Sequence, residues 1–121
     1  MAIQQRQHGF DTFLIKAPDG ITSVTIVPER GAVASSMTLS HDGLSREILF
    51  QHDNFWTIEG DLPGGSPFLF PVCARLKRDG VNGVYSYGGQ YFQLPIHGFA
   101  SYMAWQVVEK NPHALHLCLT S

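Results

Sequence analysis

Short runs in which apolar residues recur at every second position are the feature that most constrains the fold of this chain. Residues 12–16 (TFLIK) and 21–27 (ITSVTIV) are two such runs, separated by APDG, a sequence typical of a tight turn. No stretch carries apolar residues at helical spacing over three turns. Because alternate side chains of a strand point to opposite faces, the pattern predicts half-buried strands rather than helices.

Four further runs show the same alternation: residues 31–40, 44–51, 103–107 and 115–119. In residues 31–40, Val33, Met37 and Leu39 are expected on one face, and in 44–51 Leu44, Ile48 and Phe50 alternate with polar residues. Leu115, Leu117 and Leu119 form the last such row. Glycines and prolines lie mostly between the runs, so we predict an all-β fold, an antiparallel β-sandwich of short strands and hairpins.

Composition narrows the class of protein. Apolar residues make up 44% of the 121 residues and charged residues 15%, which is typical of a globular domain with a core. The net charge of −2, with no basic stripe, argues against a nucleic-acid partner. The chain lacks an apolar run of membrane-spanning length and a secretory signal. Two cysteines in apolar segments, Cys73 and Cys118, favour a reducing cytoplasm over a disulfide framework.

The last residues, 114–121 (ALHLCLTS), alternate as a strand up to the final residue, without a turn or polar tail. This pattern favours residues 1–121 being the N-terminal portion of one larger β domain. The alternative is a short final strand that closes a small sandwich. In the first case strand edges stay unpaired, and a homodimer formed through such edges is expected.

Arg75 is a candidate ligand-binding residue. It follows the nearly all-apolar run 68–73, and a guanidinium at the rim of a core can bind ligand oxygens with several donors. Spacing alone favours an ordinary ion pair instead. The candidate carboxylates are Asp53, Glu59 and Asp61, and they lie in or near a long turn-rich connection, residues 52–71, of the kind that often carries function.

His97 is a candidate because of its neighbours. It stands between Pro95, whose backbone torsion is fixed, and Gly98, which tolerates torsions forbidden to other residues, so its imidazole is held on a turn. Turns also carry many histidines without function. His113 and His116 point to opposite faces of a strand and are not a metal pair, and we predict no metal and no cofactor. The aromatic residues of 85–92 (YSYGGQYF) predict a packed hairpin rather than a sugar platform.

Four segments in order, GAVASSMTL, EILFQ, GGSPFLFPVCARL and YFQLPIHGFASYMAW, carry a family resemblance. From about Thr22 onward the chain resembles the N-terminal portion of the aldose 1-epimerase (galactose mutarotase-like) family, closest to the hexose-6-phosphate 1-epimerase-like branch. The most specific part is the pair PFLFPVCARL and LPIHGFA.

The resemblance implies a large antiparallel β supersandwich that interconverts the α and β anomers of a hexose or hexose phosphate. In such enzymes a carboxylate removes the proton of the C1 hydroxyl and a histidine protonates the ring oxygen. Arg75 matches the substrate-binding arginine and His97 the first active-site histidine. Ser101 stands where the family usually has arginine, which leaves the phosphate preference open.

The family's second histidine and its carboxylate correspond to positions beyond residue 121. The resemblance therefore implies half of an active site and little activity of this chain alone. The alternative interpretation is a non-catalytic carbohydrate-binding or interaction module.

Overall fold

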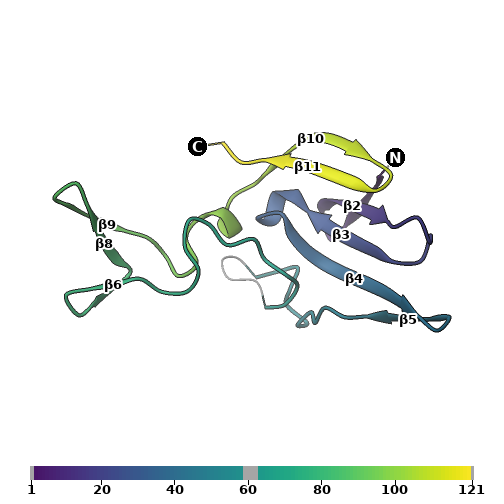
Figure 1. Ribbon diagram of the computed structural model, residues 1–121, viewed down its shortest axis with the longest axis horizontal. Helices are drawn as coiled ribbons and strands as arrows, with labels where there is room; N and C mark the ends of the chain where they lie inside the picture. Colours follow the sequence, from purple (N-terminus) through teal and green to yellow (C-terminus); the bar gives the residue numbers. More distant parts are fainter. Residues whose placement is uncertain (1, 59–62, 121) are drawn as a thin grey trace.

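A five-stranded antiparallel sheet forms the body of the protein, in a computed structural model that describes residues 2–58 and 63–120. The strand order is the chain order, so each strand pairs with its sequence neighbour (Figure 1). The strands are β1 (Ile3–Gln7), β2 (Phe10–Lys16), β3 (Ser23–Val27), β4 (Val33–His41) and β5 (Leu44–Glu47). A short 3-10 helix, η1 (Pro28–Arg30), joins β3 to β4. The prediction of an all-β, antiparallel fold is confirmed.

A hairpin of β10 (Gln106–Asn111) and β11 (Ala114–Cys118) lies against this sheet (Figure 1). Leu115 and Leu117 share an apolar groove with Ile15 and Ile26 of the sheet. Leu119 lines the next groove together with Leu117. Leu115 and Leu117 of the predicted row therefore face the sheet, whereas Leu119 follows β11, which ends at Cys118.

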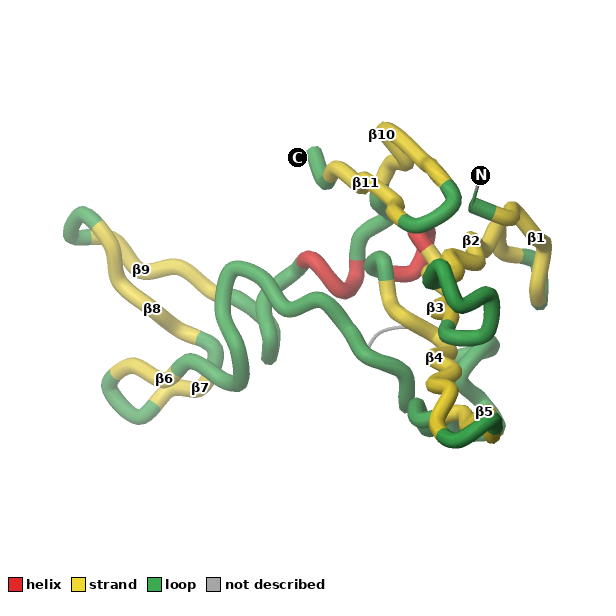
Figure 2. Tube along the Cα trace, turned by 45° about the vertical axis from the view of Figure 1, so that its right-hand side comes forward, coloured by secondary structure: helices red, strands yellow, loops and turns green. Residues whose placement is uncertain are grey.

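An arm extends away from the body and carries two small hairpins (Figure 1 and Figure 2). The first is β6 (Lys77–Arg78) with β7 (Val81–Asn82), and the second is β8 (Val84–Tyr87) with β9 (Gln90–Gln93). No residue between 72 and 94 is buried. The predicted hairpin around Gly88 and Gly89 is present, but its expected packing is only partial. Tyr85 and Phe92 stack at 5.4 Å, whereas Tyr87 and Tyr91 are 79% and 64% exposed because the arm has no layer opposite them.

The core of the body is small. Val27, Val33 and Phe55 form its buried cluster, and Phe10 and Trp56 pack against them. Phe55 is fully buried although it comes from the long connection 52–71, a kind of segment that often carries function. Part of this connection is therefore structural.

A β-bulge changes the faces of β4. Thr25 pairs with Ser36 and Ile26 with Ala34, so one extra residue of β4 stands between these pairs. Because an extra residue reverses the alternation, Val33 packs in the core whereas Met37 and Leu39 line a separate groove. The prediction that these three side chains share one face is wrong for Val33.

Two strand boundaries also differ from the sequence pattern. β5 ends at Glu47, so Ile48 and Phe50 lie outside it and are 49% and 70% exposed. The Glu47 carboxylate accepts hydrogen bonds from the N–H groups of Met37 and Leu49, which turns the chain at this point. The edge strand β1 (IQQRQ) was missed because it is almost entirely exposed and has no apolar alternation.

Candidate functional site

His97 lies on a tight turn, as the sequence predicts. The N–H of Gly98 donates to the carbonyl of Pro95 at 2.9 Å, and φ is +65° at His97 and +78° at Gly98. A Cβ atom at position 98 would lie 2.6 Å from the carbonyl carbon of Phe70 and 2.7 Å from Cδ of Pro71. Glycine is therefore required here for two reasons, the left-handed backbone and the closeness of the neighbouring chain.

The turn is bound to the segment that precedes Arg75. The N–H groups of Phe99 and Ala100 both donate to the carbonyl of Phe70, at 3.0 and 3.2 Å. The N–H of His97 donates to the carbonyl of Ala74 at 2.9 Å. These contacts join the two sequence motifs, PFLFPVCARL and LPIHGFA, into one unit.

The imidazole of His97 takes part in the same contact. The backbone N–H of Ala74 donates to Nδ1 of His97 at 2.7 Å. Because Nδ1 accepts this hydrogen bond, the neutral ring carries its hydrogen on Nε2. The free edge of the ring therefore offers an N–H donor.

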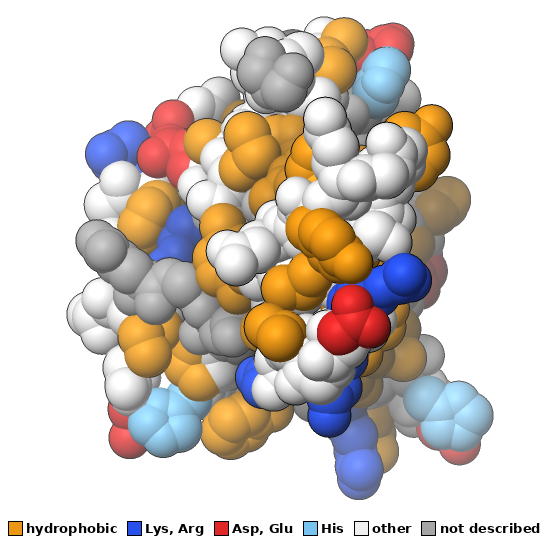
Figure 3. Space-filling model, turned by 90° about the vertical axis from the view of Figure 1, so that its left-hand side faces the viewer, with side chains coloured by type: hydrophobic (Ala, Val, Ile, Leu, Met, Phe, Trp, Pro, Cys, Tyr) orange, Lys and Arg blue, Asp and Glu red, His pale blue; other side chains and the backbone are white. Residues whose placement is uncertain are grey.

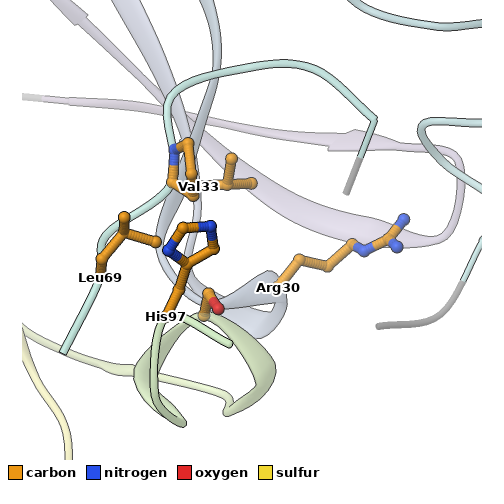
Figure 4. A pocket seen from close by; sticks show the side chains of 7 residues that line it. Arg30, Val33, Leu69 and His97 are labelled. Atoms are coloured by element: carbon orange, nitrogen blue, oxygen red, sulfur yellow. The ribbon is translucent and has the colours of Figure 1, made fainter. Parts of the chain in front are cut away.

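His97 also lines a cavity of about 280 Å³ next to the core (Figure 4). In Figure 4 the imidazole lies close to Leu69 and Val33. The cavity is lined by Arg30, Gly31, Val33, Pro67, Leu69, His97 and Ser101. A donor at the edge of a cavity with both apolar and polar lining residues can orient one polar group of a small ligand.

Arg30, which sequence analysis did not identify, has its guanidinium directed away from His97 (Figure 4). Nη1 donates to the carbonyl of Phe55 at 2.8 Å and Nη2 to the carbonyl of Ile58. The guanidinium also lies 5.1 Å from the ring centre of Phe10. Arg30 thus anchors the connection that carries Phe55 to the body. Its sequence signal is PERG, in which Pro28 and Gly31 bracket a short helical turn between two strands.

Arg75 is exposed and does not line the cavity. Arg75 directly follows Ala74, whose backbone N–H and carbonyl are both hydrogen-bonded to His97. Of the carboxylates proposed as ion-pair partners, Asp53 forms no ion pair with Arg75 among the described residues. Glu59 and Asp61 lie outside the described residues. Lys77 and Arg78 stand in the arm, where Arg78 lies 3.8 Å from Asp79.

Ser101 belongs to η2 (Ala100–Tyr102) and lines the cavity beside His97. Gly31, at φ +66°, lies so close to it that an added Cβ would stand 2.6 Å from Cα of Ser101. This approach brings the connection between η1 and β4 next to η2, the short helix that follows the His97 turn. The residue that replaces the expected arginine is therefore next to the site and carries no charge.

Two other expectations concern metal and membrane sites. Over residues 2–58 and 63–120, no three His, Cys, Asp or Glu side chains are grouped as metal ligands. His113 lies in the turn between β10 and β11, where its Nδ1 is 2.6 Å from the carbonyl of Lys16. His116 is part of β11. Within the same residues no helix is long and apolar enough to cross a membrane.

No protein-family model matches this chain, and no curated protein does. Among solved structures, the crystal structure of the Slr1438 protein from Synechocystis sp. PCC 6803 is similar. The two chains are 25% identical, with a TM-score of 0.68, and the match covers 83% of this chain and 32% of that one. The chain therefore spans about a third of the length of that protein.

Proposed function

We propose that this chain is the sugar-binding part of an aldose 1-epimerase-like protein that interconverts the anomers of a hexose. The observation that carries the proposal is the pairing of residues 70–74 with 97–100, which brings the two motifs of the family resemblance together. The pairing places His97 at a cavity and brings the backbone of Arg75 next to the His97 turn.

The chemistry follows from the donors of this unit. Nε2–H of His97 can donate to a sugar hydroxyl or to the ring oxygen, on which negative charge develops as its bond to C1 breaks. Arg75, with five N–H donors, can bind further sugar oxygens. With Nδ1 engaged and Nε2 protonated, neutral His97 acts as a donor rather than as the base that removes the C1 hydroxyl proton.

An unphosphorylated hexose fits this cavity better than a hexose phosphate. A phosphate needs cationic or multiple N–H donors within reach. Arg30 is the one cation in the described lining of the cavity, and its guanidinium is directed to the carbonyls of Phe55 and Ile58. Ser101, at the position where the family usually has arginine, offers only a hydroxyl.

Titration by two-dimensional NMR with galactose, glucose and glucose 6-phosphate tests the proposal. Free hexoses should shift the amide signals of His97, Gly98 and Ser101, and His97→Ala should weaken these shifts. His113→Ala is the matched control, because His113 lies in another turn and contacts Lys16. Absence of any response to the sugars in the wild-type protein would contradict the proposal.

A non-catalytic carbohydrate-binding module is the second candidate. It is favoured by the lining of the cavity, which includes no carboxylate among the described residues, whereas anomerisation needs a base within hydrogen-bond reach. We expect the 121-residue chain to bind sugar without exchange above the spontaneous rate. In a longer chain that contains this segment, anomer exchange measured by NMR supports the epimerase, and binding without exchange supports the module.

The cytoplasm is the compartment that we propose for the protein. Both cysteines are free thiols, and Cys73 is exposed. An exposed thiol persists where the surroundings are reducing. Mass spectrometry after alkylation of intact cells should find Cys73 in its reduced form.

A further inference from the structure

His97 and Ala74 share an unusual backbone conformation. Ala74 has φ +72° and His97 has φ +65°, and neither is glycine. The left-handed region brings Cβ too close to the backbone, so such residues persist only where their surroundings hold them. Each of these two residues therefore requires an external restraint.

The two residues restrain each other. Ala74 donates its N–H to Nδ1 of His97 at 2.7 Å, and its carbonyl accepts the N–H of His97 at 2.9 Å. Both polar groups of the Ala74 backbone are thus bound to one residue that lies 23 positions away. We call this pair of hydrogen bonds the 74–97 clamp.

We propose that His97 is a positioning residue, whose Nδ1 holds Ala74 in the left-handed conformation and so sets the direction in which Arg75 leaves the turn. Arg75 is exposed, so the orientation of its backbone decides which part of the surroundings its guanidinium reaches. The effect of this orientation on sugar binding rests on the proposed function, whereas the 74–97 clamp does not.

Substitutions at position 97 separate the clamp from other effects. Asparagine tolerates the left-handed region, and its Oδ1 occupies about the place of Nδ1, so His97→Asn keeps an acceptor for Ala74. Alanine offers no acceptor. Arg75→Ala is the matched control, since it leaves both hydrogen bonds of the clamp in place.

Amide hydrogen exchange and imidazole nitrogen shifts, both by NMR, test the clamp without any ligand. We expect Nδ1 of His97 to be unprotonated and the Ala74 amide to be protected. His97→Ala should speed exchange of that amide about tenfold, the loss expected for one hydrogen bond. His97→Asn and Arg75→Ala should leave the protection near that of the wild type. A protonated Nδ1, or unchanged protection in His97→Ala, would overturn the clamp.

Sugar affinity tests the positioning role. Glycine adopts φ +72° without penalty. If His97 acts through Ala74, Ala74→Gly should restore part of the galactose affinity that His97→Ala loses. No restoration would mean that His97 acts only by direct contact and would overturn the positioning role. Failure of the wild-type protein to bind any hexose would instead contradict the proposed function and leave the clamp result standing.

The exposed surface of the chain carries a second, independent inference. The accessible surface is 7896 Å² for a chain of 13.4 kDa. A compact monomer of that mass exposes about 6,500 Å², so this chain exposes roughly 1,400 Å² more than expected. A standard protein interface covers about 800 Å² on each partner. The excess is thus large enough for one complete interface.

Large apolar side chains contribute to this exposed surface. Phe68, Phe70 and Phe99 are 51%, 51% and 37% exposed and border a groove of about 500 Å³. In Figure 3, which views the molecule from the end of the arm, hydrophobic side chains are spread across the visible face. The groove is lined by Phe68, Phe70, Phe99, Met103, Trp105, Leu117, Cys118 and Leu119.

We infer that a second copy of the chain covers this groove. β11 pairs only with β10 within the described residues, so its other edge has free backbone donors and acceptors. Two such edges related by a two-fold axis can pair antiparallel, which brings both apolar grooves into one interface. A net charge of −2 opposes this association only weakly.

Sedimentation velocity measures the association directly. The wild-type protein should sediment as a dimer at micromolar concentration, and Leu119→Glu, which places a charge in the groove, should yield a monomer. Val108→Glu is the matched control, because Val108 is 58% exposed on β10 and does not line the groove. A monomeric wild-type protein, or a dimer that Leu119→Glu does not disrupt, would overturn the inference.

Discussion

Replacing Gly98 by alanine tests the geometry of the His97 turn. The backbone at Gly98 has φ +78°, which costs an alanine about 1–2 kcal/mol. The added Cβ would also stand 2.6 Å from the carbonyl carbon of Phe70, and insertion of a methyl group into such a contact costs about 1–3 kcal/mol. The two effects together predict a loss of about 2–5 kcal/mol in the free energy of unfolding, a large part of the 5–15 kcal/mol typical of a domain.

Urea unfolding followed by tryptophan fluorescence measures this loss. Trp105 reports on the region of the site, because its Nε1–H donates to the carbonyl of Ala100 at 3.0 Å. Gly88→Ala is the matched control: Gly88 has φ +57°, and no atom lies within 4 Å of its added Cβ. The control should lose only about 1–2 kcal/mol, from the backbone strain alone. Equal losses in the two variants would refute the inference that the chain at Phe70 closely approaches the turn.

Three further predictions concern other parts of the molecule. Arg30→Met removes the donors to the carbonyls of Phe55 and Ile58, and its unfolding free energy in urea should fall by about 1–3 kcal/mol. The Thr22 hydroxyl and the N–H groups of Ile21 and Thr22 hold the pKa of Asp19 below its usual value of 3.8. The stability that Asp19 contributes is therefore present above this value and is lost as the pH falls through the lowered folded-state pKa. Asp19→Asn should flatten this decline when the free energy of unfolding is measured from pH 5 to pH 2. In a longer chain that shows anomer exchange, His97→Ala should lower turnover ~10²-fold, and unchanged exchange would make His97 an ordinary turn residue.

Alternation in the sequence predicts most of the strands because it records which faces are half-buried. The strands β2, β3 and β11 follow their patterns, since each has one face against another layer. β1 is an edge strand with almost no burial, so nothing in its composition marks it. The bulge in β4 depends on pairing with β3, and a single strand pattern does not contain that information.

The site was predictable only where local residues determine it. Pro95 and Gly98 fix the His97 turn within four residues, and the structure confirms that turn. The partner of the imidazole, Ala74, is 23 residues away and is an alanine in a glycine-like conformation, so no sequence signal marks it. Arg30 was missed for a similar reason, because its role depends on carbonyl groups of Phe55 and Ile58 that only the folded chain brings near.

The order of strands in the sheet has a consequence for folding kinetics. Each strand from β1 to β5 pairs with the next one along the chain, so the body forms by closing short loops. The contact between Ala74 and His97 instead requires closure of a loop of 23 residues that contains the whole arm. We therefore expect the His97 turn to assemble after the sheet, so that substitutions in β2 or β3 slow folding and substitutions in the turn chiefly speed unfolding, as stopped-flow kinetics would measure.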